Sequence, residues 1–290
     1  MSLPQGKILL VLLIVIFFAM HGYKLYIERS VPKEYEIGFY NFEDFNGKAA
    51  RWTMGKSVVS KRAKGNFMTF EVFAAPHNIR KNGLNLNIFL NGQLWDSVEF
   101  LASGWKRMNY FIPFMRNDII VLQTSVSKTF TPLKLGFSQD SRSLGVAMTE
   151  IKFSDTMPQD GVGFYQWEAG NHEAVPDWPK NQPFKFRWTG MRASMSLENE
   201  SKGGLILFLK CNHPDINNKP VKVKILGDYK LIKEEVFTDK SWRNIMLTAD
   251  KLRKSKILTF EVSRVWNPRL SGSSEDTRDL GVAVAVAPIL

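Results

Sequence analysis

An eight-residue pattern that occurs twice constrains the fold of this chain more than any other feature. Asp140–Ala147 reads Asp-Ser-Arg-Ser-Leu-Gly-Val-Ala, and Asp276–Ala283 reads Asp-Thr-Arg-Asp-Leu-Gly-Val-Ala. The same spacing carries Arg51-Trp52-Thr53 onto Arg187-Trp188-Thr189. Because separate landmarks agree on one register, we infer that the chain contains two copies of one domain.

The chain is long enough for both copies, since 290 residues of which 44% are hydrophobic can fill two cores. The landmarks and the intervening composition give the following boundaries: a membrane anchor or signal segment at 1–23, a stalk at 24–36, repeat one at 37–153, a linker at 154–161 and repeat two at 162–290.

The N-terminus predicts a membrane helix. Ile8–Met20 is wholly apolar, which is short for a span of about 20 residues and also suits the core of a signal peptide. No small-x-small cleavage site follows, so we expect an uncleaved single-pass anchor. Lys24, Arg29 and Lys33 after the run favour a cytoplasmic body under the positive-inside rule. Very short N-terminal tails usually stay inside, and on this ground we expect the body to be extracytoplasmic.

Alternation of apolar and polar residues predicts strands in both halves. Leu84–Leu90 alternates and is followed by Asn91-Gly92, a strong signal for a hairpin turn, while Val221–Ile225 alternates before a turn at Gly227-Asp228. Further strands are expected at 67–73, 109–114, 119–126, 144–153, 205–209, 244–247, 257–262 and 280–286. No segment keeps a helical period for long. We therefore predict an all-β protein of two tandem β-sandwiches of jelly-roll type.

The order of the repeated motifs resembles a known domain. Each copy has Gly-Phe-Tyr, then Phe-Glu or Trp-Glu, then Arg-Trp-Thr and finally Asp-x-Arg-x-Leu-Gly-Val-Ala. This order resembles a β-sandwich domain that accompanies bacterial glycosyltransferases and related proteins of surface-polysaccharide assembly. The resemblance implies a jelly-roll-like sandwich with a carbohydrate-binding or scaffolding role. Because no transferase domain is attached here, the resemblance implies a protein with a binding or assembly role.

Five charged or aromatic residues recur in both copies. They are Glu43, Arg51, Trp52, Asp140 and Arg142, with the counterparts Glu168, Arg187, Trp188, Asp276 and Arg278. Asp-x-Arg puts both side chains on one face of a strand or closes a tight turn, where an arginine–carboxylate bridge can join two loops. We interpret these residues as a structural motif, although the same groups could hold sugar hydroxyls. Ligand selection is then expected where the repeats diverge.

The clearest divergence is the loop Ala169–Gln182, which only repeat two contains. An exposed Trp178 there could stack on the apolar face of a sugar while His172 and Asp177 bond to its hydroxyls. The alternative is a hydrophobic lid over the boundary between the domains. Trp266 and Arg269 belong to a second candidate glycan-binding loop. Three other tryptophans, Trp95, Trp105 and Trp242, are predicted to pack in the cores.

The formal net charge of +11 favours acidic partners. Lys222 and Lys224 project from one strand, and Lys230 and Lys233 from its return strand, which gives a candidate basic face for anionic polysaccharide or phospholipid headgroups. An ordinary solvated surface is the alternative. Nucleic acid is not expected as a partner, because no basic-aromatic recognition motif is present.

No catalytic motif, metal-binding spacing or cofactor signature stands out, so we expect no enzyme activity, metal or cofactor. The sequence favours a non-catalytic, membrane-anchored protein that binds a glycan or glycolipid during surface-polysaccharide assembly. The alternative is a structural module that docks a protein partner in a membrane complex. A cleft lined by Trp178 and Trp266 would favour the glycan, and a flat apolar patch the protein partner.

Overall fold

A computed structural model describes residues 34–79, 83–112, 118–179, 182–197, 203–252 and 255–289. The predicted membrane segment and all but the last residues of the predicted stalk lie outside these ranges. Among the residues described, the helices are too short and too polar to cross a membrane.

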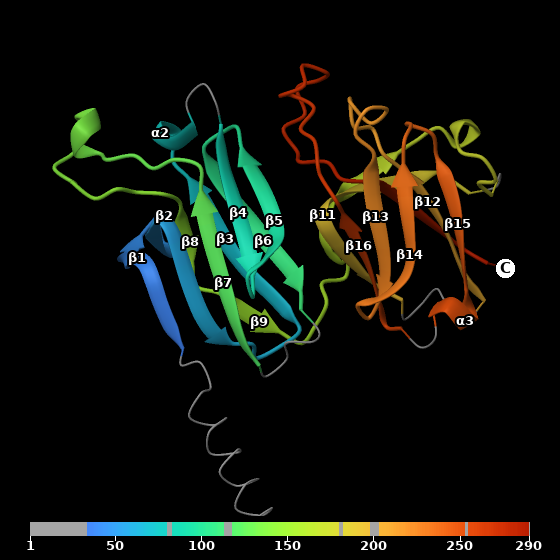
Figure 1. The fold of residues 1–290 in the computed structure, drawn as a ribbon, viewed down its shortest axis with the longest axis horizontal. Coiled ribbons are helices and arrows are strands. Elements are labelled where there is room, and N and C mark those ends of the chain that lie inside the picture. Colours follow the sequence, from blue (N-terminus) through green and yellow to red (C-terminus); the bar gives the residue numbers. More distant parts are fainter. Residues whose placement is uncertain are drawn as a thin grey trace, which may run out of the picture.

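Repeat one forms a nine-stranded sheet (Figure 1). Its strands are β1 (Tyr35–Asp44), β2 (Ala49–Arg62), β3 (Phe67–Ala74), β4 (Leu84–Leu90), β5 (Gln93–Phe100), β6 (Gly104–Phe111), β7 (Ile119–Val126), β8 (Ala147–Thr149) and β9 (Lys152–Ser154). The order is β5-β4-β7-β2-β8-β3-β6, with β1 on β2 and β9 on β3. Short helical turns interrupt the connections: α2 (Pro76–Ile79) and η3 (Leu133–Leu135).

Repeat two forms an eight-stranded sheet. Its strands are β10 (Val162–Ala169), β11 (Lys185–Ser196), β12 (Gly204–Lys210), β13 (Val221–Gly227), β14 (Lys230–Phe237), β15 (Arg243–Thr248), β16 (Ile257–Val262) and β17 (Ala283–Pro288). Its order, β14-β13-β16-β11-β17-β12-β15 with β10 on β11, matches that of repeat one strand for strand. Its helical turns are η4 (His172–Ala174) and α3 (Ala249–Leu252).

Each sheet curls because one long strand serves both of its halves. In repeat one, the end of β2 from Lys56 to Arg62 pairs with β7, whereas Ala50–Trp52 pairs with β8. The two halves enclose one apolar core that includes Phe70 of β3 and Leu86 of β4. The all-β prediction is confirmed. Each repeat is a single sheet folded over its core, a refinement of the two-sheet sandwich expected.

The glycine of the repeated pattern is required by close backbone packing. A Cβ on Gly145 would lie 2.5 Å from the carbonyl oxygen of Met54, and one on Gly281 would lie 2.4 Å from that of Gly190. These separations are well inside van der Waals contact, so only glycine fits. The pattern therefore keeps its glycine because the chain passes directly over β2 in repeat one and over β11 in repeat two.

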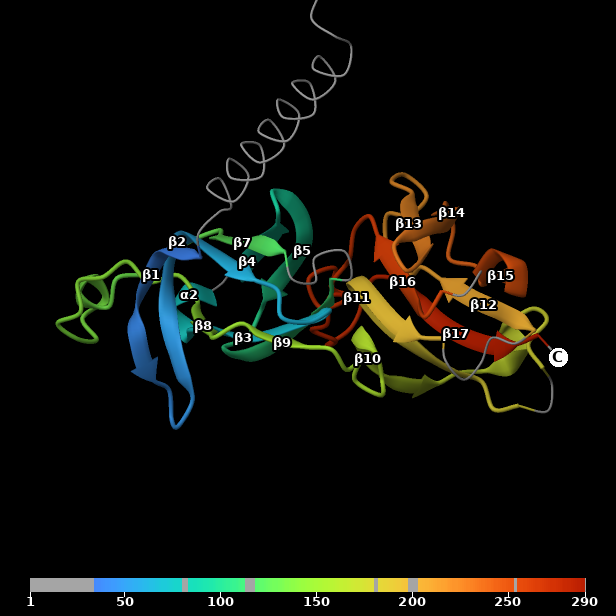
Figure 2. The same cartoon turned by 90° about the horizontal axis from the view of Figure 1, so that it is seen from below.

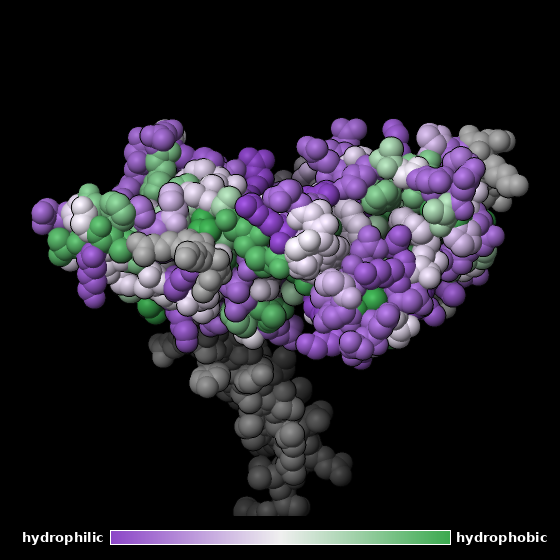
Figure 3. Space-filling view, turned by 90° about the horizontal axis from the view of Figure 1, so that it is seen from above, coloured by the Kyte–Doolittle hydropathy of each residue, from purple (hydrophilic) through white to green (hydrophobic). Residues whose placement is uncertain are grey.

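The repeats lie side by side and contact one another (Figures 1 and 2). An apolar cluster crosses the boundary from Phe67 and Phe111 of repeat one to Tyr229 and Ile257 of repeat two. The Tyr229 hydroxyl also donates a hydrogen bond to the Phe111 carbonyl oxygen. Seen from above, hydrophobic residues gather over repeat one and this boundary, whereas repeat two shows a mainly hydrophilic surface (Figure 3). We call this boundary the seam.

Candidate ligand-binding sites

The repeated Asp-x-Arg motif builds the same ionic knot in each repeat. Arg142 contacts Asp140 at 2.8 Å and Glu43 of β1 at 2.5 Å. In repeat two, Arg278 contacts Asp276 at 2.6 Å and Glu168 of β10 at 2.7 Å. Each arginine therefore joins an edge strand to the loop before β8 or β17. The knots thus form the arginine–carboxylate bridge between two segments that Asp-x-Arg led us to expect, and their contribution to stability stays a prediction.

The electrostatics of the knots follow from these contacts. The arginine's hydrogen bonds lower the pKa of Asp140 and of Asp276 below that of a free aspartate. The same contacts raise the pKa of Arg142, chiefly through Asp140 and then Glu43. All of these groups therefore stay charged near neutral pH.

The Arg-Trp-Thr motif also has a packing role in both repeats. Trp52 and Trp188 are buried. The Arg51 guanidinium lies 4.7 Å from the Phe42 ring, and that of Arg187 lies 4.6 Å from the Trp167 ring. Arg51 also pairs with Glu36, and Arg187 donates to the Asp160 carbonyl oxygen. These arginines thus fasten the edge strands β1 and β10.

The prediction of an exposed, sugar-stacking Trp178 is wrong. Its side chain is only 8% exposed, because the loop folds back so that the ring packs edge-on against Phe184 at 4.8 Å and Phe208 at 5.0 Å. Its indole N–H donates to the Gln182 carbonyl oxygen at 3.1 Å. The apolar cluster that it covers lies within repeat two, so the lid over the seam is not found either.

The companions of Trp178 are exposed but do not converge on it. His172 begins η4, and Asp177 accepts a hydrogen bond from the Asn244 side chain at 2.5 Å. Trp266 is half-buried against Trp188 and Leu280. The side chain of Arg269 is exposed and lies 3.8 Å from Glu275. Neither of the pockets described below is lined by Trp178 or Trp266, so the cleft that would have favoured a glycan over a protein partner is not found at these two residues.

The predicted four-lysine face is also wrong as a single surface. All four lysines are exposed, but Lys224 pairs in register with Glu234, and Lys233 pairs with the buried Ile225. Residues that pair in register point to the same face of a sheet, so Lys233 lies on the core side of β14. Only Lys222 and Lys224 share the outer face of β13, next to an acidic neighbour.

The structure reveals an aromatic pocket of about 200 Å³ in repeat two. Aromatic rings line it together with amides and one ammonium group: Phe184, Phe186, Trp188, Trp242, Asn171, Asn212 and Lys210. Trp242 is half-buried and stands 5.1 Å from Phe184, edge-on, and the Lys210 ammonium lies 5.8 Å from its ring. The inserted loop contributes Gly170, Asn171 and Ala174.

The matching place in repeat one is built from different rings. Phe73 and Lys210 occupy the same position, because Phe73 pairs with Ala147 as Lys210 pairs with Ala283. The Phe73 ring lies 5.3 Å from Trp105, the counterpart of Trp242. Phe45 packs on the same group, 5.9 Å from Trp105. Repeat one therefore has an aromatic ring at the position where repeat two has the Lys210 ammonium.

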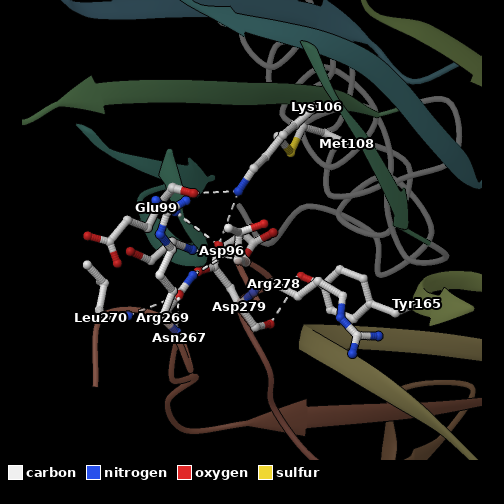
Figure 4. Close-up of polar contacts among 12 residues, drawn as sticks. Asp96, Glu99, Lys106, Met108, Tyr165, Asn267, Arg269, Leu270, Arg278 and Asp279 are labelled. Atoms are coloured by element: carbon white, nitrogen blue, oxygen red, sulfur yellow. Dashed lines mark hydrogen bonds and ion pairs between the residues drawn. The ribbon is translucent and has the colours of Figure 1, made fainter. Parts of the chain in front are cut away.

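A second cavity, the seam pocket, has a volume of about 340 Å³ and takes its walls from both repeats. Its ionisable groups are Asp96, Lys106, Arg107, Tyr110, Tyr165, Arg192, Arg278 and Asp279. Figure 4 shows how Asp279 connects the two sides. Its carboxylate accepts the Glu99 backbone N–H at 3.1 Å and lies 3.5 Å from the Lys106 ammonium. The Asn267 amide donates to it at 3.2 Å, so the loop predicted to bind glycan instead positions this carboxylate.

Asp96 is the least compensated charge in the seam pocket. It accepts hydrogen bonds from the Tyr110 hydroxyl at 2.7 Å and from the Ser97 backbone N–H at 2.8 Å. No cation lies within ion-pair distance of Asp96 among the residues described. Burial raises the pKa of Asp96 above that of a free aspartate, opposed by the Tyr110 hydrogen bond. In the described ranges, no group of His, Cys, Asp and Glu residues could hold a metal ion.

Sequence reasoning missed both pockets. It named Trp188 as a structural residue and placed Trp242 in the core, whereas both line the aromatic pocket. One available signal was the exchange of Phe73 for Lys210 between the repeats, which becomes visible once the two copies are aligned by strand. The seam pocket had no comparable signal, because its walls depend on how the repeats dock.

Comparisons with known proteins do not identify a family. No family model and no curated protein matches this chain. Among solved structures, it is similar to a catalytic domain with two CBM51 domains from Clostridium perfringens ZmpB, at 8% identity and a TM-score of 0.25 over 84% of this chain and 35% of that one. The tandem CBM22 domains of Paenibacillus barcinonensis Xyn10C match at 10% identity and a TM-score of 0.23 over 89% of this chain and 91% of that one. TM-scores this low support no inference about fold or ligand.

Proposed function

We propose that this chain is a non-catalytic glycan-binding protein and that the aromatic pocket of repeat two is its saccharide site. The observation that carries the proposal is the difference between the repeats. Trp242 and Trp188 border an open pocket with polar groups at its edge, whereas rings of Phe73 and Phe45 pack at the matching place in repeat one.

The chemistry of the pocket suits part of a sugar ring. Aromatic faces bury the apolar C–H surface of a sugar, and a few placed polar groups fix its orientation. Asn171 and Asn212 offer amide donors and acceptors, and Lys210 offers an ammonium donor to hydroxyl oxygens. At about 200 Å³ the pocket is smaller than the pockets that enclose whole ligands, which are about 300–1,000 Å³. It therefore accommodates one residue of an exposed glycan chain.

The same lining favours binding over hydrolysis. Glycoside hydrolysis generally uses two carboxyl groups on opposite sides of the bond that breaks. None of the residues that line the aromatic pocket is an aspartate or a glutamate. The proposal therefore assigns recognition to this site and no chemical step.

The proposal also places the protein at a membrane. The apolar run Ile8–Met20 would anchor it, with the body outside the cytoplasm, where surface glycans or glycolipids are met. The resemblance of the repeated motifs to domains of surface-polysaccharide assembly supports an accessory role in that process. A protein partner in such a membrane complex fits the same placement.

A glycan-array screen of the full chain in detergent micelles tests the proposal, comparing wild type with Trp242→Ala. Trp105→Ala is the matched control, since Trp105 is the counterpart in repeat one and has the Phe73 ring where Trp242 has Lys210. We expect wild type and Trp105→Ala to bind the same glycans equally well and Trp242→Ala to bind them more weakly, with circular dichroism unchanged. Undiminished binding in Trp242→Ala, or no glycan binding by wild type, would refute the assignment.

A further inference from the structure

The seam pocket has the composition of a second ligand site. Its volume of about 340 Å³ falls within the range of ligand pockets, and such pockets occur preferentially at domain interfaces. Its walls combine the Phe164 and Tyr165 side chains with Asp96, Asn109 and the charged groups named above. Neither repeat forms it alone.

Most of the charges in this wall are already paired. Lys106 contacts Asp279, as described, and Arg107 bonds to Glu71 at 2.9 Å. Arg192 contacts Glu261 at 2.6 Å and stacks on the Trp95 ring at 3.6 Å. Arg278 is held in its knot by Asp276 and Glu168. These pairs leave a wall that is nearly neutral overall and rich in polar atoms.

Asp96 is the exception that indicates the class of ligand. An ionised carboxylate accepts about four hydrogen bonds, and Asp96 receives two from the protein. Asp96 is half-buried, so its spare acceptor positions face the cavity, where a ligand donor can reach them. A ligand that carries no charge leaves the paired charges of this wall undisturbed. A neutral ligand with hydroxyl donors meets the need.

We propose that the seam pocket is a second saccharide subsite, built jointly by the two repeats, in which the Asp96 carboxylate accepts hydrogen bonds from sugar hydroxyls. The inference rests on the proposed function for its class of ligand. Because the walls come from both repeats, a bound sugar also holds repeat one against repeat two.

Hydrogen bonds from sugar hydroxyls to the Asp96 carboxylate would make the affinity of the seam pocket for a sugar depend on pH. Hydroxyl donors stabilise the charged form of Asp96, so binding lowers its pKa and is strongest above the pKa of the free protein. Affinity is then lost as the pH falls through that raised pKa. The groups that act on Asp96 are Tyr110 of β6, Arg192 of β11 and Asp279 of the loop before β17, and Lys106 of β6 and Tyr165 of β10 line the same cavity. Glu99 of β5, whose backbone N–H binds Asp279, also has a pKa raised by burial.

Fluorine NMR of the full chain labelled with 5-fluorotryptophan reports both sites in one titration. The Trp95 ring stacks on Arg192, which lines the seam pocket, and Trp242 borders the aromatic pocket, so their resonances report on the two sites. Variants of single tryptophans to phenylalanine assign the eight signals. The probes are methyl glycosides of glucose, galactose, mannose and N-acetylglucosamine.

We expect at least one glycoside to shift the Trp95 resonance in wild type and in Trp242→Ala. Asp96→Asn should bind about tenfold or more weakly at the seam while the Trp242 response stays unchanged. The wild-type Trp95 response should also weaken at acidic pH, a readout that needs no substitution. A Trp95 signal that never shifts, or that shifts equally in Asp96→Asn, overturns the inference. Shifts at Trp242 alone would leave the proposed function standing, and shifts at Trp95 alone would refute the aromatic pocket instead.

Discussion

Removing Arg278 tests whether the ionic knot holds repeat two together. The arginine makes charge-assisted hydrogen bonds to two carboxylates, and such bonds contribute about 1.5–3 kcal/mol when they are well shielded. The Arg278 side chain is 32% exposed, and exposed pairs contribute about 1 kcal/mol or less. We therefore expect Arg278→Ala to lower the free energy of unfolding by about 1–2 kcal/mol.

Urea denaturation followed by circular dichroism measures this loss, and two controls define it. Arg269→Ala removes an exposed arginine 3.8 Å from its carboxylate, so it should cost less than about 0.5 kcal/mol. Arg278→Lys keeps the charge but loses the planar fork, and it should fall between alanine and wild type. Equal losses for Arg278→Ala and Arg269→Ala would refute the reasoning.

The free energy of unfolding lost in Arg278→Ala should also depend on pH. Arg278 lowers the pKa of Asp276 in the folded state, chiefly by hydrogen bonding. The resulting stability is present above the pKa of an unfolded aspartate, about 3.9, and is lost as the pH falls through the folded value. The difference between wild type and Arg278→Ala should therefore shrink below about pH 4. A difference that grows there would contradict the assignment of the knot.

Three further substitutions or modifications check the packing. Gly163 has φ +75°, and a Cβ there would lie 2.0 Å from a backbone oxygen of β11, so Gly163→Ala should lower the free energy of unfolding by about 2 kcal/mol or more. A Cβ on Gly190 would meet its nearest neighbour at an ordinary contact distance of 3.7 Å, so Gly190→Ala should cost far less in the same denaturation assay. Burial raises the pKa of the Cys211 thiol to about 12, so iodoacetamide should label it in urea but not in the native chain, as read by mass spectrometry. Trp178→Ala should lower the free energy of unfolding by about 3 kcal/mol, as measured by calorimetry. Trp167→Ala should lower it by much less, because Trp167 is exposed.

The strands were predictable where alternation and turn chemistry agree. Leu84–Leu90 is found as expected, and Asn91 and Gly92 both adopt positive φ in the turn that follows. A two-residue turn at Asn91-Gly92 would set Ile88 opposite Trp95, but a β-bulge shifts the register, so Ile88 pairs with Asp96 instead. A bulge of one residue leaves no mark in the hydrophobic pattern, yet it helps set where Asp96 stands at the seam.

Side-chain exposure in loops was the weakest part of the prediction. Trp178 lies in a polar, proline-flanked segment, which suggests an exposed ring, but the loop folds back over Phe208 and buries it. The register of β14 similarly decides that Lys233 points away from the outer face of Lys224. The burial of Trp178 depends on contact with a strand thirty residues further along the chain, and the orientation of Lys233 depends on a register shift within the β13–β14 hairpin. Local composition encodes neither.

Lys210→Phe tests the central claim most directly, because it places in repeat two the residue that repeat one carries at Phe73. The new ring should pack against Trp242 as Phe73 packs against Trp105, and so fill the aromatic pocket without harming the sheet. Isothermal titration of the full chain with a glycan identified by the array should then show at least a tenfold loss of affinity at this pocket, about 1.4 kcal/mol. Affinity equal to that of wild type, in a folded Lys210→Phe protein, would contradict the account.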